Sequence, residues 1–342
     1  MNIFPRKEAS RSIQKNSPER LHKIIWSVAG GKGGTGKTIL TANLGIGMAI
    51  LGYNVILIDA DLGIPNLHNY LRMNRPVKTL DDFIANKTKR LTDVIIDTPL
   101  KNLKFISGGT NLVGIANIPY SKKQKLIRQI NMLEADIIMV DLGAGISNNT
   151  IDFFNISSCG MVVSNPEPNA NQDAYFFLKN AVYRRIKAFT GINENFKTAF
   201  SAYRDENGYG SFDMPELYNF LQGYSPEAYN DFDELLDEFN PRLIMNKVRK
   251  HGQKKDGIWF VNLVKTFLEI EVDNLGELKY DKRIIQSSED IFPFILRYPS
   301  AKITKNLFSI LSDLNTSDMG YHDVRTFKRF RSLLKQQQKR WM

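Results

Sequence analysis

One glycine-rich segment, residues 31–38, has residue types and a spacing that are suited to binding phosphate. It fits the pattern G-x-x-x-x-G-K-[ST], in which backbone N–H groups surround phosphate oxygens, the lysine reaches the β- and γ-phosphates and the hydroxyl binds Mg²⁺. An apolar run precedes the segment and a helical pattern follows it, and this context separates the motif from a structural glycine turn. The residues expected to bind a nucleotide are Gly31, Gly33, Gly34, Thr35, Gly36, Lys37 and Thr38, with Thr38 also a metal ligand.

Carboxylates follow two other apolar runs. Val55–Ile58 is followed by Asp59 and Asp61, and Ile137–Val140 is followed by Asp141. At the carboxyl edge of a parallel sheet, such side chains can organise Mg²⁺ and its waters, or position the water that attacks a phosphate. Of the pair Asp59 and Asp61, one can serve the metal and the other the water, and Asp141 is expected to hold Mg²⁺, although carboxylates at strand ends often only cap loops.

These motifs resemble those of the MinD/ParA family of P-loop ATPases. K-G-G-x-G-K-T, which begins at Lys32, is similar to the family's deviant Walker A motif, and D-x-D-x-G-x-x-N-L, from Asp59 to Leu67, is similar to its switch I. The resemblance implies that ATP drives homodimerisation and that Lys32 reaches the partner's nucleotide, whereas a solvated loop lysine is the alternative. It also implies that Asp61 positions the attacking water, so that Lys32, Lys37 and Asp61 are the catalytic residues and Asp59 joins Thr38 and Asp141 as a metal ligand.

Within that family the flagellar regulators FlhG and FleN have the most similar motifs. The stretch S-N-P-E-P followed by D-A-Y, in residues 164–175, and D-L-G-A-G from Asp141 resemble that branch. The arm at the N-terminus lacks the motif D-Q-A-x-x-L-R that the branch uses to activate its partner GTPase, so a flagellar role stays open. The segment L-I-M-N-K-V implies that Asn246 pairs with adenine, and a buried capping asparagine is the alternative.

The order of the expected elements predicts the fold. Apolar strands alternate with helical segments, which indicates an α/β fold with a mostly parallel sheet and helices on both faces. We divide the chain into a flexible basic arm (1–22), a P-loop ATPase domain (23–312) and a linker with a basic amphipathic helix (313–342). Residues 190–240 interrupt the alternation and are expected to form a helical insertion. Within it, residues 205–216 partly mimic a calcium-binding loop, but a polar turn is the favoured interpretation.

The positive charge of the chain is concentrated at its two ends. The net charge is +10 overall, +4 in residues 1–23, +7 in residues 324–342 and −1 in the body between them. On a helix, the C-terminal segment separates its basic residues from an apolar stripe, which is typical of a helix that binds an anionic membrane surface. Docking on the protein's own body or on a partner, and nucleic-acid binding, are the alternatives. The apolar stripe comprises Val324, Phe327, Phe330, Leu334, Trp341 and Met342.

Together these features predict an ATP hydrolase that is slow unless a partner protein stimulates it. With ATP and Mg²⁺ it would dimerise and cycle between cytoplasm and membrane, to position or count a structure such as a flagellum or the cell pole. The alternatives are a DNA-associated partitioning ATPase of the ParA kind, which the near-neutral body disfavours, and an ATP-gated regulator that sequesters a partner protein. The single cysteine, Cys159, and the absence of a long apolar run exclude a disulfide framework and a membrane-spanning helix.

Overall fold

The computed structural model describes residues 23–109, 118–208, 212–249, 254–319 and 326–341. Among these residues, no helix combines the length and the apolar character needed to cross a membrane. The strands are β1 (Ile24–Ala29), β2 (Val55–Ala60), β3 (Ile96–Asp97), β4 (Leu103–Ile106), β5 (Ile137–Leu142), β6 (Cys159–Ser164), β7 (Arg242–Val248) and β8 (Asp273–Lys279). The helices are α1 (Lys37–Leu51), α2 (Leu67–Tyr70), α3 (Leu80–Ile84), η1 (Leu91–Val94), α4 (Tyr120–Met132), α5 (Asn148–Asn155), α6 (Pro168–Phe189), α7 (Glu194–Asn207), α8 (Met214–Tyr224), α9 (Pro226–Asp237), α10 (Lys254–Leu268), α11 (Lys282–Glu289), α12 (Phe294–Arg297), α13 (Lys302–Met319) and α14 (Phe327–Trp341).

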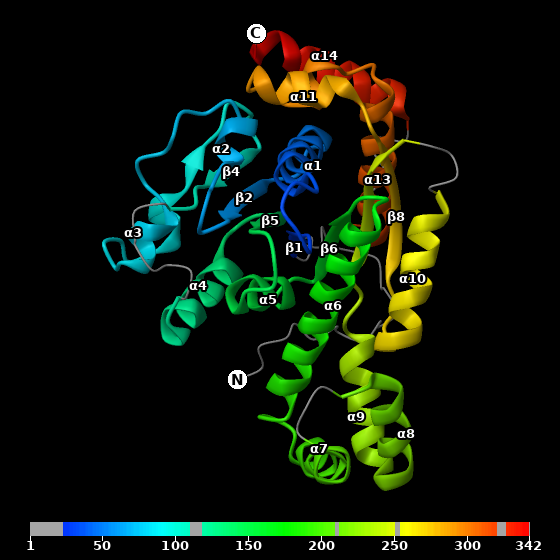
Figure 1. The fold of residues 1–342 in the computed structure, drawn as a ribbon. Coiled ribbons are helices and arrows are strands. Elements are labelled where there is room, and N and C mark those ends of the chain that lie inside the picture. The colour runs from blue at the N-terminus through cyan, green and yellow to red at the C-terminus, as the bar shows by residue number, and fades with distance from the viewer. Residues whose placement is uncertain (1–22, 110–117, 209–211, 250–253, 320–325, 342) are drawn as a thin grey trace, which may run out of the picture.

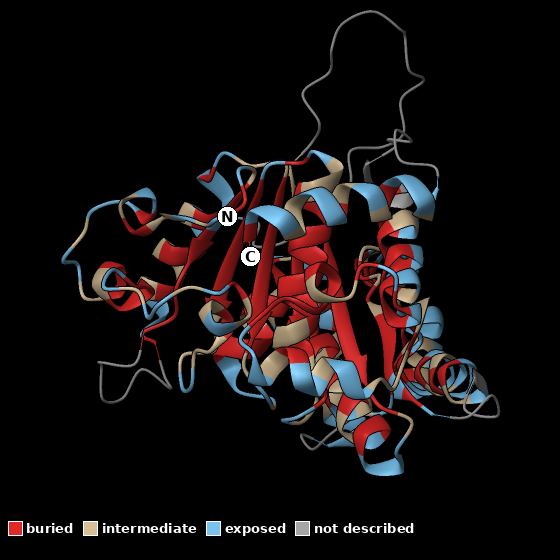
Figure 2. Cartoon of the chain, turned by 90° about the horizontal axis from the view of Figure 1, so that it is seen from above, coloured by how far each residue is buried: buried red, intermediate tan, exposed pale blue. Residues whose placement is uncertain are grey.

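The strands form one sheet in the order β3-β4-β2-β5-β1-β6-β7-β8 (Figure 1). All neighbouring strands are parallel except β3, which pairs antiparallel with β4. Residues alternate between two cores: in β5, Ile138 and Val140 pack with α4, α5 and α6, whereas Ile137 and Met139 pack with α1, α13 and α14. Figure 2 shows the strands buried between these two helical layers. The predicted α/β class is confirmed.

The helical insertion is confirmed as α7, α8 and α9, which follow the far end of α6 (Figure 1). Its own core is aromatic: the ring of Phe196 stacks on that of Phe232, with ring centroids 5.2 Å apart, and lies 5.1 Å from that of Phe189 at the end of α6. The calcium-loop alternative is not supported, because Asp205 lies within α7 and Asp213 caps α8 by accepting the N–H of Glu216. Residues 209–211 of that stretch lie outside the described residues.

The structure places the C-terminal helix α14 on the body of the protein. Phe330 and Leu334 are fully buried and Trp341 nearly so, in the core shared with α1, α12 and α13. The ring of Phe330 lies 5.0 Å from that of Phe308, and the Arg72 guanidinium donates to the Trp341 carbonyl. In this conformation the body of the protein covers the described residues of the stripe, as in the docking alternative, and binding of the helix to a membrane stays a prediction. Val324 and Met342 lie outside the described residues.

Two further boundaries differ from the expectation. Helix α13 continues to residue 319, so a helix occupies the start of the segment interpreted as a linker from residue 313. The antiparallel strand β3 was not predicted, because two residues carry no periodic signal. Residues 1–22, interpreted as a basic arm, lie outside the described residues. Cys159 is buried in β6, as expected for a small core residue.

Candidate functional site

The P-loop joins β1 to α1, and two of its glycines are required by their surroundings. Gly36 has φ 96°, in the left-handed region, and a Cβ there would clash with the amide of Asn246. A Cβ on Gly31 would clash with the backbone of Asp173, because the first turns of α6 pack directly on the loop. The loop is therefore held between α6 on one side and the end of β7 on the other.

Lys37 is the buried cation of this loop. Its ammonium Nζ lies 3.3 Å from the carbonyl oxygen of Lys32, to which it donates across the loop. Burial lowers the pKa of Lys37, while the charges of Asp141 and Asp61 oppose that shift. A phosphate bound inside the loop would replace the carbonyl as the partner of this ammonium, which is the role predicted for Lys37.

Asp59 and Asp141 occupy neighbouring strands in the same register, β2 and β5, and both are fully buried. Burial and the mutual repulsion of the two carboxylates raise the pKa of Asp59. Burial likewise raises the pKa of Asp141 to about 7, although hydrogen bonds from Thr38 and Thr41 and the charge of Lys37 favour its ionised form. Two buried carboxylates that disfavour each other's charge form an environment that a cation would stabilise.

The donor set fits Mg²⁺ with phosphate and water as further ligands. One oxygen of Asp141, Oδ2, is buried without a hydrogen-bond partner, while Oδ1 accepts from the Thr41 hydroxyl at 2.9 Å. The described residues contain no group of three or more His, Cys, Asp and Glu side chains able to hold a metal. Mg²⁺ commonly takes one or two carboxylates together with substrate phosphates and waters, so Thr38, Asp59 and Asp141 are a sufficient protein contribution.

This geometry predicts a pH dependence for metal binding. The folded-state pKa of Asp141, about 7, exceeds the ordinary value of 3.8, so the metal-free protein loses stability as the pH rises through that interval. Bound Mg²⁺ would remove this cost by compensating the charge of the carboxylates. We expect the increase in Tm produced by Mg²⁺ with ADP, relative to ADP with a chelator, to be at least about 3 °C larger at pH 8 than at pH 6. Scanning calorimetry measures this difference, and an equal increase at both pH values in the unaltered protein would contradict it. Asp141→Asn is the control and should reduce the difference, leaving the part that comes from the buried Asp59.

Asp61 connects the two segments that resemble the switches. Its Oδ1 accepts the backbone N–H groups of Gly63 and Ile64, each at 3.1 Å, so the carboxylate organises switch I. The same oxygen lies 3.3 Å from the point where a Cβ on Gly143 would stand, which places it against switch II. Unlike Asp59, the Asp61 side chain is only half-buried, and a water molecule could reach it.

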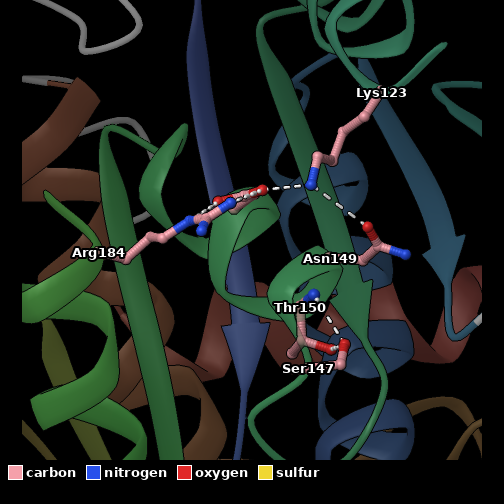
Figure 3. A network of polar contacts seen from close by, with 6 residues as sticks. Lys123, Ser147, Asn149, Thr150 and Arg184 are labelled. Carbon is pink, nitrogen blue, oxygen red and sulfur yellow. Dashed lines mark hydrogen bonds and ion pairs between the residues drawn. The ribbon is translucent and has the colours of Figure 1, made fainter. Parts of the chain in front are cut away.

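Helix α5, which follows switch II, is held by a buried ionic network (Figure 3). Asp152 accepts the Arg184 guanidinium of α6 at 2.7 and 3.0 Å and forms an ion pair with Lys123 of α4, which is almost fully buried. Lys123 also donates to Asn149 at 3.4 Å. Removing one partner of a buried pair commonly costs about 3–5 kcal/mol, so this network fixes α5 against its two neighbours.

Lys32 lies at the rim of the loop. Its ammonium forms an ion pair of 3.2 Å with Glu167, the residue that precedes α6, and the two side chains are 32% and 60% exposed. An exposed pair of this kind is worth about 0–1 kcal/mol, so Lys32 can leave it at little cost. The partners Glu167 and Thr41 were not predicted as site residues; S-N-P-E-P was the only signal that pointed to the first.

The sequence model of the CobQ/CobB/MinD/ParA nucleotide binding domain matches residues 26–293, which include every site residue described above. The chain belongs to this family.

Other members of the MinD/ParA family are similar in sequence to part of this chain. It is 34% identical over 164 residues to a putative septum site-determining protein MinD of Tupiella akineta, covering 48% of this chain and 53% of that protein. It is 32% identical over 162 residues to the antiactivator FleN of Pseudomonas aeruginosa, covering 46% and 57%. The chain thus spans about half the length of the curated relatives that it matches.

Solved structures support the MinD/ParA fold over nearly the whole chain. MinD of Pyrococcus horikoshii, in complex with Mg-ADP, superposes with a TM-score of 0.57 at 19% identity, covering 86% of this chain and 96% of that one. Cyanothece McdA in complex with ATP gives a TM-score of 0.58 at 14% identity, covering 89% and 99%. At such identities the likeness establishes the fold alone.

Asn246 lies beneath the P-loop of this MinD/ParA domain. Its side-chain nitrogen Nδ2 donates to the Thr35 carbonyl at 2.8 Å and its Oδ1 accepts the N–H of Lys247, also at 2.8 Å. Each of the two amide atoms makes one of the two hydrogen bonds open to it, so one donor and one acceptor position are left beside this support of the loop. The pairing of Asn246 with adenine stays a prediction. In this structure the Asn246 side chain supports the P-loop.

Proposed function

We propose that the chain is an ATPase that binds ATP with Mg²⁺, forms a dimer in the ATP state and dissociates after hydrolysis. The observation that carries this proposal is the convergence of Lys37, Asp61 and the buried pair Asp59 and Asp141 on one edge of the sheet. Phosphoryl transfer needs three kinds of charged group, and all three are present there. They are a cation for the phosphates, carboxylates for a metal and a carboxylate for the attacking water.

In the proposed reaction, Asp61 orients a water molecule for in-line attack on the γ-phosphorus. The bond from that phosphorus to the oxygen bridging to the β-phosphate breaks, which yields ADP and inorganic phosphate. Lys37 stabilises the charge on the phosphate oxygens, and bound Mg²⁺ would supply the second positive charge. Asp61 also contacts switch II, so loss of the γ-phosphate would alter both switches together.

The dimer is supported by what the rim of the site exposes. Ile64 of switch I is 76% exposed and Ile146, after switch II, is 52% exposed, and they lie in the segments that follow the carboxyl ends of β2 and β5. A second copy placed against this edge of the sheet would cover both apolar side chains. Lys32, which forms an exposed ion pair with Glu167 here, would then reach the phosphates of the partner's nucleotide.

We further propose that α14 leaves its groove in the ATP-bound dimer and binds an anionic membrane, so that the protein cycles on that surface. Arg72, whose guanidinium contacts the Trp341 carbonyl of α14, comes shortly after α2 in the chain, and α2 begins where switch I ends. A movement of switch I would therefore be transmitted through α2 to α14. The exposed side of the docked helix is already basic, with Lys328, Arg329, Lys335, Lys339 and Arg340. By likeness to FleN and MinD, we propose that this cycle positions or counts a cellular structure, such as a flagellum or the cell pole.

Co-sedimentation with vesicles tests the membrane step. We expect the full chain to sediment with vesicles that contain phosphatidylglycerol in ATP, less so in ADP, and not with phosphatidylcholine alone. A variant that ends at residue 323 should lose binding under every condition while keeping its ATPase activity. Leu334→Ser, which removes an apolar group from the stripe, should bind more weakly than Ser332→Ala on the exposed side. Equal sedimentation in ATP and ADP would contradict nucleotide control of the tail.

One observation favours the DNA-associated alternative. The insertion, residues 190–240, contains eleven acidic and two basic residues, so the remainder of the body carries a net charge of +8 rather than the near-neutral value of the body as a whole. Residues 67–135 alone contain twelve basic and five acidic residues. Binding to a 60-base-pair duplex that falls steeply with added salt, and only in ATP, would support this function instead.

A further inference from the structure

Two consecutive residues of β7 fasten the P-loop to a strand that lies two places from β1 in the sheet. The amide of Asn246 donates to the Thr35 carbonyl at 2.8 Å, and the ammonium of Lys247 donates to the Gly34 carbonyl at 2.6 Å. The rest of the Lys247 side chain is exposed, so packing does not explain where its ammonium lies.

The backbone at this point is irregular in a way that aims both side chains at the loop. Met245 pairs with Glu277 and Val248 with Lys279, so two residues of β7 stand opposite one residue of β8. Lys247 has φ 56°, in the left-handed region that a lysine rarely adopts. Bulges of this kind occur next to active sites, where they redirect a side chain, and unusual backbone of this kind is concentrated at functional sites.

We infer that Lys247, with Asn246, is a positioning residue that holds the backbone of residues 34–36 of the P-loop in its phosphate-binding form. In a trans peptide unit the C=O and the following N–H point in opposite directions. Fixing the Gly34 and Thr35 carbonyls toward β7 therefore turns the N–H groups of Thr35 and Gly36 to the opposite side, where they can meet phosphate. This inference rests on the proposed ATP site and assigns it a further residue, and it predicts an effect on ATP affinity rather than on the chemical step.

Lys247→Gly separates positioning from structural support. Glycine adopts φ 56° freely, so this variant should keep or raise the Tm while it loses the ammonium. We expect the Kd for ATP to rise about tenfold and the kcat at saturating ATP to stay within about twofold. Lys247→Ala should show the same loss of affinity with a lower Tm, and Lys247→Arg should retain most of the affinity.

The measurements are isothermal titration with ATP and Mg²⁺, phosphate release at saturating ATP, and the Tm, all on the full chain. Lys279→Ala, on the neighbouring strand, is the matched control and should change none of the three. If Lys247→Gly binds ATP as the unaltered protein does, or if its kcat falls while its Kd is constant, the inference is overturned. If the unaltered protein itself fails to bind ATP, the proposed function fails instead, so the two failures are distinguishable.

Discussion

Replacing Asp61 with alanine is expected to lower ATP turnover by about 100-fold or more, while the Kd for ATP changes by less than about threefold. The reason is geometric: the carboxylate is half-buried at the edge of the site, against switch II, whereas the phosphate-binding groups lie in the P-loop. Phosphate release under saturating ATP and Mg²⁺ measures the turnover, and titration calorimetry measures the affinity.

Two variants separate this effect from a change in the shape of switch I. Asp61→Asn keeps an oxygen that can accept the N–H groups of Gly63 and Ile64, but it lacks the charge, so it should fold normally and still turn over slowly. Asp97→Ala removes an exposed carboxylate from the edge strand β3 and should leave turnover unchanged. Turnover within threefold of normal in Asp61→Ala would remove this residue from the mechanism.

Replacing Lys32 with alanine is expected to abolish ATP-dependent dimerisation and to leave ATP binding by the monomer nearly intact. In the monomer the lysine forms an ion pair with the exposed carboxylate of Glu167, so its removal costs about 1 kcal/mol or less. In a closed dimer the same ammonium would be desolvated next to phosphate oxygens, where a charge pair is worth several kcal/mol. The loss should therefore appear in assembly, with turnover reduced to the rate of an isolated monomer.

The assay is most sensitive in an Asp61→Ala background, which would trap the ATP dimer. Light scattering after size-exclusion chromatography should show a dimer for Asp61→Ala in ATP and a monomer for the double variant with Lys32→Ala. Glu167→Gln, which frees the lysine, should dimerise at least as well as the background. A dimer of unchanged affinity in the double variant would refute the trans role of Lys32. Lys37→Ala should instead lose ATP binding itself, because Lys37 is the buried cation of the loop.

The results for Asp61→Ala and for the double variant also test what releases α14 from the body of the protein. In this structure α14 buries Phe330 and Leu334 against α1 and its neighbours, so the conformation shown withholds the apolar stripe from lipid. If Asp61→Ala sediments with vesicles and the double variant does not, dimer formation rather than ATP binding releases the helix. Two helices on one dimer would then add their weak individual affinities, as the proposal of cycling on a membrane requires.

The sequence alone determined that the sheet is mostly parallel and where its active edge lies, although not the edge strand β3 or the order of the strands. Buried parallel strands need continuous apolar residues, so the runs at Ile24–Ala29 and Ile137–Val140 were recognisable without any knowledge of their neighbours. The P-loop was equally readable, because its chemistry depends on backbone and side-chain groups within eight consecutive residues. Asp59 and Asp141 could be placed at the same edge, because parallel strands end on the same side.

Only the tertiary structure decided the interactions that join distant segments. Two contacts with the P-loop depend on how α6 and β7 lie against it, and no local pattern encodes their distances. They are the ion pair of Lys32 with Glu167 and the hydrogen bond from the Lys247 ammonium to the Gly34 carbonyl. The same holds for α14. An amphipathic helix signals that one face needs apolar surroundings, but a membrane, a partner and the protein's own groove satisfy that need equally, so its docking was a property of the fold and not of the helix.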